Sequence, residues 1–494
     1  MHFFVTGATG LVGRALIQSL LGQEHEVTAW VRDVHRARQR LGSRVQLCAI
    51  ASSDTELARR LSSVDVVVNL AGESVLGGAW TDARKRALRE SRVQLTQQLM
   101  AACRAAARPP RVVISGSAVG YYGDSADLVR EEDSPVGSGF LAELCVDWER
   151  AALAAQAWGA RVVLLRIGIV LSADGGALAA MLPAFALGLG GPLGSGKQYM
   201  PWIHRDDLVA IIMQAANDAR FAGPINCAAP EPVTSQVFAR TLGGVLSRPA
   251  VLRVPAFALR AVLGERACVA LQSQRAVPRA LERWGFAFRH AQLAAALRQC
   301  VERSAGVSIR RATRADRIPA RRKPAYVLEQ TTRLHVPLAE AFGFFCRAEN
   351  LGFITPGFMK FELLGEPPGE MREGAEIRYR IGLGPVPMRW KTEIRSWQPP
   401  SLFVDTQVEG PYALWWHEHH LQTDGESTVM LDRVYYTPPL GLLGRLAHGL
   451  LVARTLRAIF GYRQEAIARL FGPRAADSDQ RSWDQTRNQG GSAI

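Results

Sequence analysis

The sequence lacks the cysteine pattern of a disulfide-stabilised or zinc-binding protein. Its seven cysteines lie far apart along 494 residues, and no two of them form a Cys-x-x-Cys pair. Structural zinc sites and small secreted domains both place their cysteines at short, recurring spacings. The observed spacing excludes both and predicts reduced thiols, as in a cytoplasmic protein.

Long uninterrupted apolar runs are also missing. The chain begins MHFFVTGATG, in which Thr6 and Gly7 interrupt a short apolar run without a charged residue before it. This pattern predicts a first strand and not a secretory signal. One uncharged stretch, residues 175–196, contains Pro183, Pro192 and several glycines, which would break a membrane-spanning helix. We therefore expect no transmembrane segment, and we expect this stretch to be buried or to line a cleft.

Residues 303–323 contain almost no acidic residues and carry much of the positive charge of the chain. The net charge is +14, and half of it lies in residues 303–323, which contain eight basic residues and only Asp316 as an acid. No aromatic residues are interleaved there, and no nucleic-acid-binding motif occurs elsewhere. A charged run of this kind is usually solvated. We therefore expect a linker and no nucleic-acid partner.

Short β-branched runs alternate with helical patterns over the first 170 residues. The expected strands are residues 2–6, 26–31, 45–48, 64–70, 111–115 and 161–167, with helical patterns such as 11–21 and 80–107 between them. This alternation predicts an α/β fold with a doubly wound parallel sheet. The next 130 residues are less regular and then helical, as in a small substrate lobe.

The pattern changes after residue 325. Expected strands at 376–381, 389–396, 402–407 and 428–436 follow one another, and an amphipathic helix is expected at 442–471. This order predicts a separate α+β domain. The expected organisation is a first domain at 1–240, its helical lobe at 241–301, an arginine-rich linker at 302–324, the α+β domain at 325–473 and a disordered tail at 474–494.

A glycine-rich turn, GATGLVG, directly follows the first expected strand and opens a helical pattern. Gly7 would permit a tight turn, Gly10 the close approach of a pyrophosphate, and Gly13 the packing of helix against strand. Free N–H groups at the start of the helix would then bind the anion. This turn predicts a Rossmann-type dinucleotide site. Its expected cofactor-binding residues are Gly7, Thr9, Gly10, Leu11, Val12 and Gly13.

The end of the second expected strand indicates which dinucleotide binds. Val31 stands where an acidic residue would bind the ribose of NAD, and Arg32 follows with a guanidinium suited to a 2′-phosphate. We therefore favour NADP(H), while Asp33 as a ribose ligand keeps NAD open. Small residues after the fourth and fifth strands would let the cofactor pass close to the sheet. The further cofactor-binding residues expected there are Asn69, Ala71, Gly72 and Ser115.

Several segments in order carry a family resemblance: NLAGE (69–73), ISGSAVGYYG (114–123), FLAELCVDWE (140–149), LRIGIVLS (165–172), LGLGGPLGSGKQ (187–198), WIHRDDLV (202–209) and APEPVT (229–234). The chain resembles extended short-chain dehydrogenases/reductases. More narrowly, it resembles the sugar-epimerase-like proteins of the NAD-dependent epimerase/dehydratase family that carry a C-terminal domain of unknown function. The resemblance covers about the first 300 residues. It implies an oxidoreductase or epimerase that acts on a small molecule.

The family's usual chemistry needs a serine, a tyrosine and a lysine four residues after the tyrosine. Ser117 matches the serine. The expected position of the tyrosine–lysine pair, residues 140–144, reads FLAEL, and no tyrosine in the chain has a lysine four residues later. This departure leaves two alternatives: an enzyme with non-standard acid/base residues, or a non-catalytic cofactor-binding sensor or scaffold.

Two tyrosines directly after the serine are possible substitute acids. The candidate catalytic residues are therefore Ser117, Tyr121 and Tyr122. Lys85 and Lys197 are the only lysines in the first 300 residues and are weaker candidates. The alternative for the two tyrosines is that they line the cleft.

Two further residues in the shared segments are candidates for substrate binding, namely Arg166 and His204. His204 could instead fix a turn beside the cofactor. Asp207 is expected to cap the helix that follows.

The C-terminal pattern resembles the helix-grip, START-like (SRPBCC) fold of polyketide cyclases and lipid-binding proteins. This resemblance implies a cavity for a hydrophobic ligand, and cyclase or dehydratase chemistry there is a third alternative. His417 and His419 share one face of an expected strand, whereas His420 points away, so we expect no metal site. The aromatic residues that could line the cavity, or form ordinary core, are Trp390, Trp397, Phe403, Tyr412, Trp415 and Trp416.

Overall fold

The computed structural model describes residues 1–301, 306–320, 322–368, 371–383, 386–439, 448 and 452–472. Its contacts divide the chain into two compact units. The first comprises Met1–Ile17, His25–Val34 and Val45–Glu302, and the second comprises the remaining residues. We call these units the first and second modules and describe each by itself. The tail expected at 474–494 lies outside the described residues, as do residues 302–305 and 321 of the expected linker.

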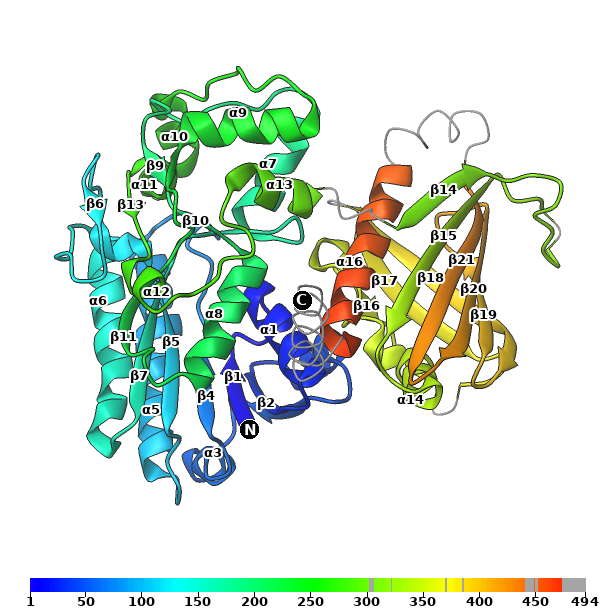
Figure 1. The fold of residues 1–494 in the computed structure, drawn as a ribbon, viewed down its shortest axis with the longest axis horizontal. Coiled ribbons are helices and arrows are strands. Elements are labelled where there is room, and N and C mark those ends of the chain that lie inside the picture. The colour runs from blue at the N-terminus through cyan, green and yellow to red at the C-terminus, as the bar shows by residue number, and fades with distance from the viewer. Residues whose placement is uncertain are drawn as a thin grey trace, which may run out of the picture. The chain divides into compact units, whose positions relative to one another are not determined.

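A seven-stranded parallel sheet forms the centre of the first module (Figure 1). The strand order is β11-β7-β5-β4-β1-β2-β3, and every neighbouring pair is parallel. The order reverses between β1 and β4, the place where ligands bind in sheets of this kind. The strands are β1 (His2–Thr6), β2 (Glu26–Val31), β3 (Gln46–Ala49), β4 (Val66–Asn69), β5 (Val112–Ala118), β7 (Arg161–Ile167) and β11 (Gly223–Cys227).

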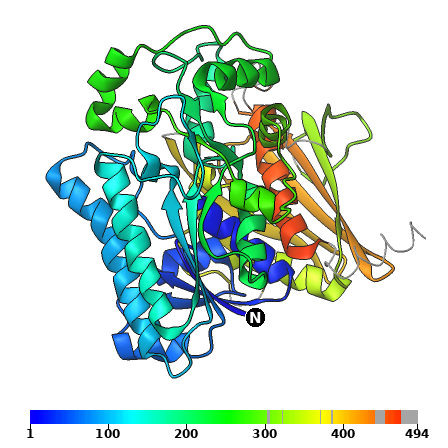
Figure 2. The ribbon, with the colours of Figure 1, turned by 60° about the vertical axis from the view of Figure 1, so that its left-hand side comes forward.

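Helices cover both faces of this sheet (Figures 1 and 2). On one face, Phe4, Val67 and Val113 of the strands pack against helical residues such as Leu57 and Leu99. Burial on both faces explains why the strands are almost continuously apolar. The main helices are α1 (Leu11–Gly22), whose residues 18–22 fall in the second module, α3 (Asp54–Leu61), α4 (Asp82–Arg89), α5 (Leu95–Ala105), α6 (Phe140–Leu153) and α8 (Arg205–Asn217). Helix α2 (Val34–Leu41) belongs to the second module from His35 onward.

A smaller lobe is built from the less regular segment. Its strands pair as β8 (Ile169–Leu171) with β10 (Trp202–His204), β9 (Tyr199–Met200) with β12 (Val233–Thr234), and β6 (Val129–Arg130) with β13 (Arg275–Ala276). The uncharged stretch at 175–196 contains α7 (Gly176–Ala186), whose Leu178 and Phe185 are buried with Trp202. The remaining helices are α9 (Ser235–Leu246), α10 (Ala256–Leu263), α11 (Cys268–Leu271), α12 (Arg279–Arg283) and α13 (Leu293–Val301). None of the described helices is long and apolar enough to cross a membrane.

The expected parallel sheet is confirmed, and β1, β2 and β7 have the expected bounds. The helix expected at 80–107 consists of α4, a π-helical segment (Glu90–Gln94) and α5. A π-helical segment widens the helix locally. Sequence periodicity alone does not reveal it.

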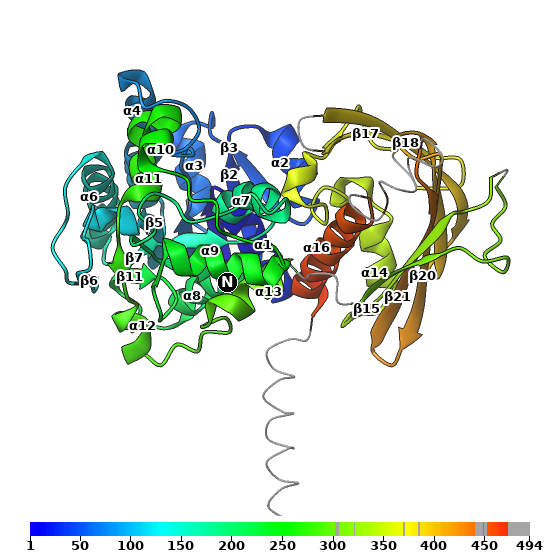
Figure 3. The ribbon, with the colours of Figure 1, turned by 90° about the horizontal axis from the view of Figure 1, so that it is seen from above.

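The second module contains an eight-stranded antiparallel sheet of order β14-β15-β21-β20-β19-β18-β17-β16. Figure 3 shows this sheet curving around α14 (Leu338–Phe345) and α16 (Ala453–Phe471). Leu456 and Phe460 of α16 pack against Trp390, Trp415 and Tyr436 of the sheet. The strands are β14 (Val307–Arg311), β15 (Tyr326–Leu334), β16 (Glu362–Leu363), β17 (Glu376–Leu383), β18 (Val386–Gln398), β19 (Leu402–Glu409), β20 (Leu414–Asp424) and β21 (Ser427–Thr437).

Part of the segment expected to be a linker belongs to this sheet. Residues 307–311 form β14, which pairs with β15, so the second module begins before residue 325. Val307 is buried and Ile309 packs against the same core. Val307 and Ile309 are the apolar residues of an alternating strand pattern. The neighbouring arginines dominate the composition of the segment and hide this pattern in the sequence. Arg310 forms an ion pair with Asp316, with an N–O distance of 2.8 Å.

We predict that Gly13→Ala destabilises the first module. A Cβ at Gly13 would lie 2.4 Å from the carbonyl oxygen of Gly7 and 2.8 Å from the Cα of Ala8, so the backbone must shift. Overpacking of this kind costs about 1–3 kcal/mol. The matched control is Gly244→Ala in α9, where a Cβ meets nothing within 4 Å. Calorimetry of the full chain should show a lower melting temperature for Gly13→Ala only. Equal effects of the two substitutions would contradict the packing role.

Candidate functional site

The glycine-rich turn joins β1 to α1 at the carboxyl edge of the sheet. Gly7 has φ of 64°, and a Cβ there would lie 2.4 Å from the carbonyl oxygen of Leu70. Gly10 is exposed, and a Cβ there would approach only the carbonyl oxygen of Gly7, at 3.1 Å. The start of α1 is therefore bare of side chains at Gly10, which is the geometry in which free N–H groups bind a phosphate. The half-buried residues of the same turn are Thr9, Leu11 and Val12.

Polar side chains fix the strand ends beneath this turn. The Thr6 hydroxyl donates to Asn69 Oδ1 at 2.7 Å, and Asn69 Nδ2 donates to the hydroxyls of Thr96 at 2.8 Å and Ser115 at 3.2 Å. The Ala71 N–H donates to Thr6 Oγ1 at 3.0 Å. The side chains of Asn69 and Ser115 are fully buried and bonded to each other. They therefore position the backbone that leads to Ala71 and Gly72.

Arg32 follows β2 at the same edge and is largely exposed. Its side chain is 80% exposed and forms an ion pair with Glu73 at 2.8 Å. Glu73 also pairs with Arg84 at 3.2 Å. Hydrogen bonds from Arg32 and Arg84 hold the pKa of Glu73 below its usual value. The Arg32 guanidinium is thus accessible and tethered by one carboxylate.

A cavity of about 350 Å³ lies beside the carboxyl end of β5. Ser117 lines it at the end of that strand, and α6 contributes apolar and sulfur-containing side chains. Its polar lining comes from Ser117, Arg92, Tyr199, Gln272 and Gln274, and the α6 residues are Leu141, Leu144, Cys145 and Trp148. The cavity therefore combines an apolar wall with a few polar groups, which is typical of small-molecule sites.

A buried ion pair lies behind Ser117. The Ser117 hydroxyl donates to Glu149 Oε1 at 2.7 Å. Arg166 binds both oxygens of Glu149, with Nε–Oε1 at 2.9 Å and Nη2–Oε2 at 3.0 Å, and the two side chains are only 4% and 9% exposed. Burial lowers the pKa of Arg166, but its hydrogen bonds to Glu149 outweigh burial and raise that pKa. Arg166 therefore orients Ser117 through Glu149 and does not itself line the cavity.

The two candidate tyrosines are held by the same arginine. The Tyr122 phenol is buried, accepts from Arg166 Nη1 at 3.0 Å and donates to Asn226 Oδ1 at 2.7 Å. Burial raises the pKa of Tyr122 to about 12. The Tyr121 ring lies 3.5 Å from the Arg166 guanidinium, centroid to Cζ. Neither tyrosine belongs to the residues that line the Ser117 cavity.

One of the two positions expected for the tyrosine–lysine pair lies in the cavity wall. Leu144 lines the cavity. Phe140 lies next to Trp80, with ring centroids 5.2 Å apart, and outside the cavity lining. Leu141, Cys145 and Trp148 are the other α6 residues in the lining. Burial raises the pKa of the Cys145 thiol to about 11.

The two lysines of this module lie outside the cavity lining. Lys85 forms an ion pair with Glu265, at 2.6 Å. Lys197 is exposed. Tyr199, which sequence analysis missed, is the phenol among the described residues that line the cavity. Its position on a two-residue strand gives no sequence signal.

His204 caps a helix and does not reach the cavity lining. It is the N-cap residue of α8, and its Nδ1 accepts from the N–H of Asp206 at 3.2 Å. Burial lowers the pKa of His204 to about 3. The expected cap, Asp207, instead accepts from the N–H groups of Arg289 at 2.9 Å and His290 at 3.1 Å. The alternative in which His204 fixes a turn therefore fits the geometry.

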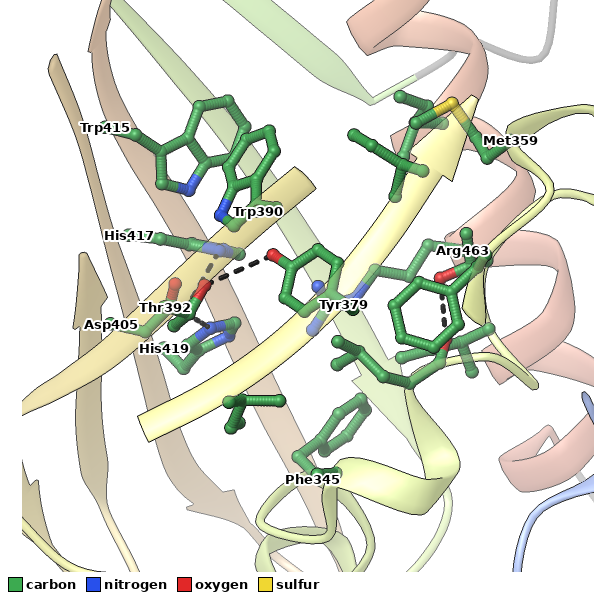
Figure 4. Close-up of a pocket in the computed structure, with 18 of the residues that line it drawn as sticks. Phe345, Met359, Tyr379, Trp390, Thr392, Asp405, Trp415, His417, His419 and Arg463 are labelled. Atoms are coloured by element: carbon green, nitrogen blue, oxygen red, sulfur yellow. Dashed lines mark hydrogen bonds and ion pairs between the residues drawn. The ribbon is translucent and has the colours of Figure 1, made fainter. Parts of the chain in front are cut away.

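The second module encloses a cavity of about 320 Å³ (Figure 4). Of the six aromatic residues considered in the sequence, five line it: Trp390, Trp397, Phe403, Tyr412 and Trp415. Trp416 lies on the other face of the sheet, packed with Val327, Val404 and Tyr435. His417 and His419 line the cavity together with Asp405, which sequence analysis did not include.

The reversed strand order, the glycine-rich turn and the cavity at the end of β5 define a Rossmann-type dinucleotide-binding protein. The chain belongs to the NAD dependent epimerase/dehydratase family, whose model matches residues 3–228. A second model, a domain of unknown function (DUF1731), matches residues 254–300. Both matches confirm the resemblance found in the sequence of the first module.

Relatives and a solved structure match the first module. "Epimerase family protein SDR39U1 homolog, chloroplastic" of Arabidopsis thaliana is 41% identical over 305 residues, 61% of this chain and 87% of that protein. Mouse "Epimerase family protein SDR39U1" is 38% identical, over 61% of this chain and 100% of its own length. The crystal structure of human SDR39U1 (isoform2) with NADPH has a TM-score of 0.56 and 36% identity, over 61% of this chain and 99% of that chain.

We predict that Glu149→Gln destabilises the first module strongly. Removing one partner of a buried ion pair leaves an uncompensated charge on Arg166 and costs about 3–5 kcal/mol. The control is Arg150→Gln, since Arg150 is 74% exposed in its ion pair with Asp147. Loss of an exposed pair costs at most about 1 kcal/mol. Urea denaturation followed by circular dichroism should separate the two variants. Similar midpoints for both would contradict the buried pair's contribution.

Proposed function

We propose that this protein binds NADP(H) in the first module and acts as an oxidoreductase or epimerase on a small molecule in the Ser117 cavity. The observation that carries the proposal is the glycine-rich turn at the start of α1, at the sheet edge where β5 ends at the cavity. Strands that run in parallel end at one edge, so a dinucleotide laid along it reaches both places. The NADPH in the human relative's crystal structure supports this assignment.

Arg32 supports NADP(H) over NAD(H). Its guanidinium is accessible and follows β2, where the 2′-substituent of the adenosine ribose lies in this fold. A guanidinium binds phosphate through paired charge-assisted hydrogen bonds. The other proposed cofactor contacts are the backbone of Gly7, Thr9, Gly10, Leu11, Val12 and Gly13, together with the strand ends at Asn69, Ala71, Gly72 and Ser115.

For the reaction we propose Ser117 and Tyr199 as the groups that contact the substrate. The Ser117 hydrogen is donated to Glu149, so its oxygen is left to accept a hydrogen bond from a substrate hydroxyl. Tyr199 supplies the phenol that faces the cavity, where it can hold or release a proton. The bound cofactor would supply hydride exchange. Tyr121, Tyr122 and Arg166 position Ser117 from behind.

The second candidate function is a non-catalytic NADP(H)-dependent sensor or scaffold. The favouring observation is that the Ser117 hydrogen is directed to Glu149, since the family's usual serine donates to the substrate oxygen. The described residues that line the cavity also include no lysine. In this alternative, binding of the cofactor would change the conformation or the partner binding of the protein, and the cofactor would not be oxidised or reduced.

For the second module we propose a hydrophobic-ligand-binding function and a START-like fold. Its aromatic cavity of about 320 Å³ within a curved antiparallel sheet supports this proposal. A molecule with a flat or branched apolar body would contact the three tryptophans.

We predict that Arg32→Ala weakens NADPH binding and leaves NADH binding unchanged. Hydrogen bonds to a charged group contribute about 1.5–3 kcal/mol, which corresponds to roughly a tenfold to hundredfold rise in Kd. Isothermal titration of the purified full chain measures both nucleotides. The control Arg59→Ala removes an arginine that is 72% exposed in α3 and paired with Glu56. Parallel loss of both nucleotides in Arg32→Ala would contradict the 2′-phosphate contact, and a folded wild type that binds neither would overturn the proposed function.

We predict that Ser117→Ala and Tyr199→Phe each abolish turnover and leave the NADPH Kd within about twofold, because both groups are assigned to the substrate. The measurements, at saturating cofactor across a panel of carbonyl and alcohol substrates, are the absorbance of NADPH for net oxidation or reduction and NMR of the recovered substrate for epimerisation, which consumes no cofactor. The control is Tyr121→Phe, whose ring still covers Arg166. Turnover that survives Ser117→Ala would remove the proposed role of Ser117. Absence of turnover in the wild type, with NADPH bound, would favour the sensor.

A further inference from the structure

Three potential ligand side chains meet on one wall of the second module's cavity (Figure 4). His417 and His419 lie two residues apart on β20 and therefore share one face. Asp405 lies on β19, directly opposite His417 in the antiparallel register. One ligand atom from each of the three residues lies within 4.8 Å of the others. Sequence spacing showed two of these ligands, and only strand pairing supplies the third.

A single oxygen faces both imidazoles. Asp405 Oδ2 lies 3.0 Å from His419 Nε2 and 3.5 Å from His417 Nδ1. Ligands bound to one transition-metal ion at about 2.0–2.2 Å are roughly 3 Å apart. The two distances from Asp405 Oδ2, with all three ligand atoms within 4.8 Å of one another, therefore leave room for one ion. A metal ion at this place could contact Asp405 and both rings together, whereas a single proton could join Asp405 to only one ring at a time.

The opposite ring nitrogens both lie close to a second carboxylate. Asp432 Oδ1, on β21, lies 3.0 Å from His417 Nε2 and 2.7 Å from His419 Nδ1. A carboxylate on the far nitrogen is the usual support of a metal-bound histidine, because it fixes the tautomer and turns the free lone pair toward the ion. Here Asp432 hydrogen-bonds to His417 Nε2 and lies at ion-pair distance from His419 Nδ1. Each imidazole then presents its other nitrogen toward Asp405.

The charges of the cluster leave one negative charge to be balanced. Asp405 and Asp432 are carboxylates, and Arg463 of α16 lies 3.5 Å from Asp432 Oδ1. With both imidazoles neutral, these five side chains carry one net negative charge. An uncompensated buried charge is costly, so a cation at this place stabilises the cluster.

We propose that Asp405, His417 and His419 bind one divalent transition-metal ion such as Zn²⁺ or Fe²⁺. Two imidazoles and one carboxylate from the protein leave coordination positions open, as in catalytic and not structural metal sites. Those positions face the cavity lined by Tyr379, Trp390 and Trp415. A cavity ligand would coordinate the ion through oxygen and place its apolar part against the tryptophans. This inference is independent of the function proposed for the first module.

The competing occupant of the same place is a proton. His419 lies 3.0 Å from Asp405 Oδ2 through Nε2 and 2.7 Å from Asp432 Oδ1 through Nδ1. A protonated His419 would therefore lie between the two carboxylates and balance the charge without a metal. The two occupants differ in one measurable respect, which is the metal content of the protein.

The test uses the untagged full chain, stripped with a chelator and titrated with Zn²⁺ and with Co²⁺. We expect one equivalent of metal per chain by mass spectrometry. We expect Asp405→Asn and His419→Gln to lower affinity by about 10–100-fold or more. His420→Gln is the matched control, because His420 lies on the same strand and contacts Glu418 on the other face, at 3.1 Å. It should bind as the wild type does.

A second measurement does not depend on variants that might misfold. X-ray absorption at the zinc edge of the loaded wild type should show two imidazole ligands and the rest oxygen. Absence of stoichiometric metal binding in the folded wild type would overturn the proposal in favour of the protonated cluster. Metal binding that is unchanged in His419→Gln, or a zinc spectrum with fewer than two imidazoles, would overturn it as well.

Discussion

The close approach of the Gly7 backbone to the end of β4 is the constraint on which the first module depends. A side chain at Gly7 would overlap the Leu70 carbonyl, and the residue has a positive φ. This contact brings the start of α1 to the reversal point of the sheet. Thr6 and Asn69 lock the same strand ends by hydrogen bonds. The nucleotide turn and the Ser117 cavity therefore share one edge, which makes chemistry between a dinucleotide and a second molecule geometrically feasible.

The two modules bury charge in different ways. Behind Ser117, one arginine meets one glutamate with two parallel hydrogen bonds, and the pair is neutral and saturated. Such a pair orients its neighbours but leaves nothing for a ligand. In the second module, two carboxylates contact two imidazoles and one arginine on the wall of a cavity. The neutral pair behind Ser117 therefore only positions its neighbours, whereas the negatively charged cluster of the second module is a candidate binding site.

The wall of the Ser117 cavity that α6 forms contains no acid or base. It consists of Leu141, Leu144, Cys145 and Trp148. The phenol that lines the cavity, Tyr199, comes from the lobe and not from that helix. A cavity whose polar groups come from several separate elements permits different chemistry on the same nucleotide scaffold.

The amino-acid sequence by itself determined the features that depend on neighbours within a few residues. These include the glycine-rich turn, the alternation that gave the bounds of β1, β2 and β7, the position of Ser117, and the shared face of His417 and His419. It did not determine which residues of α6 and β9 line the cavity, the pairing of β14, or the meeting of Asp405 and Asp432 with the two histidines. Those features arise from the register between strands and the packing of helices, which bring together residues far apart in the chain. A local pattern specifies which face a side chain occupies, and only the tertiary structure decides what that face meets.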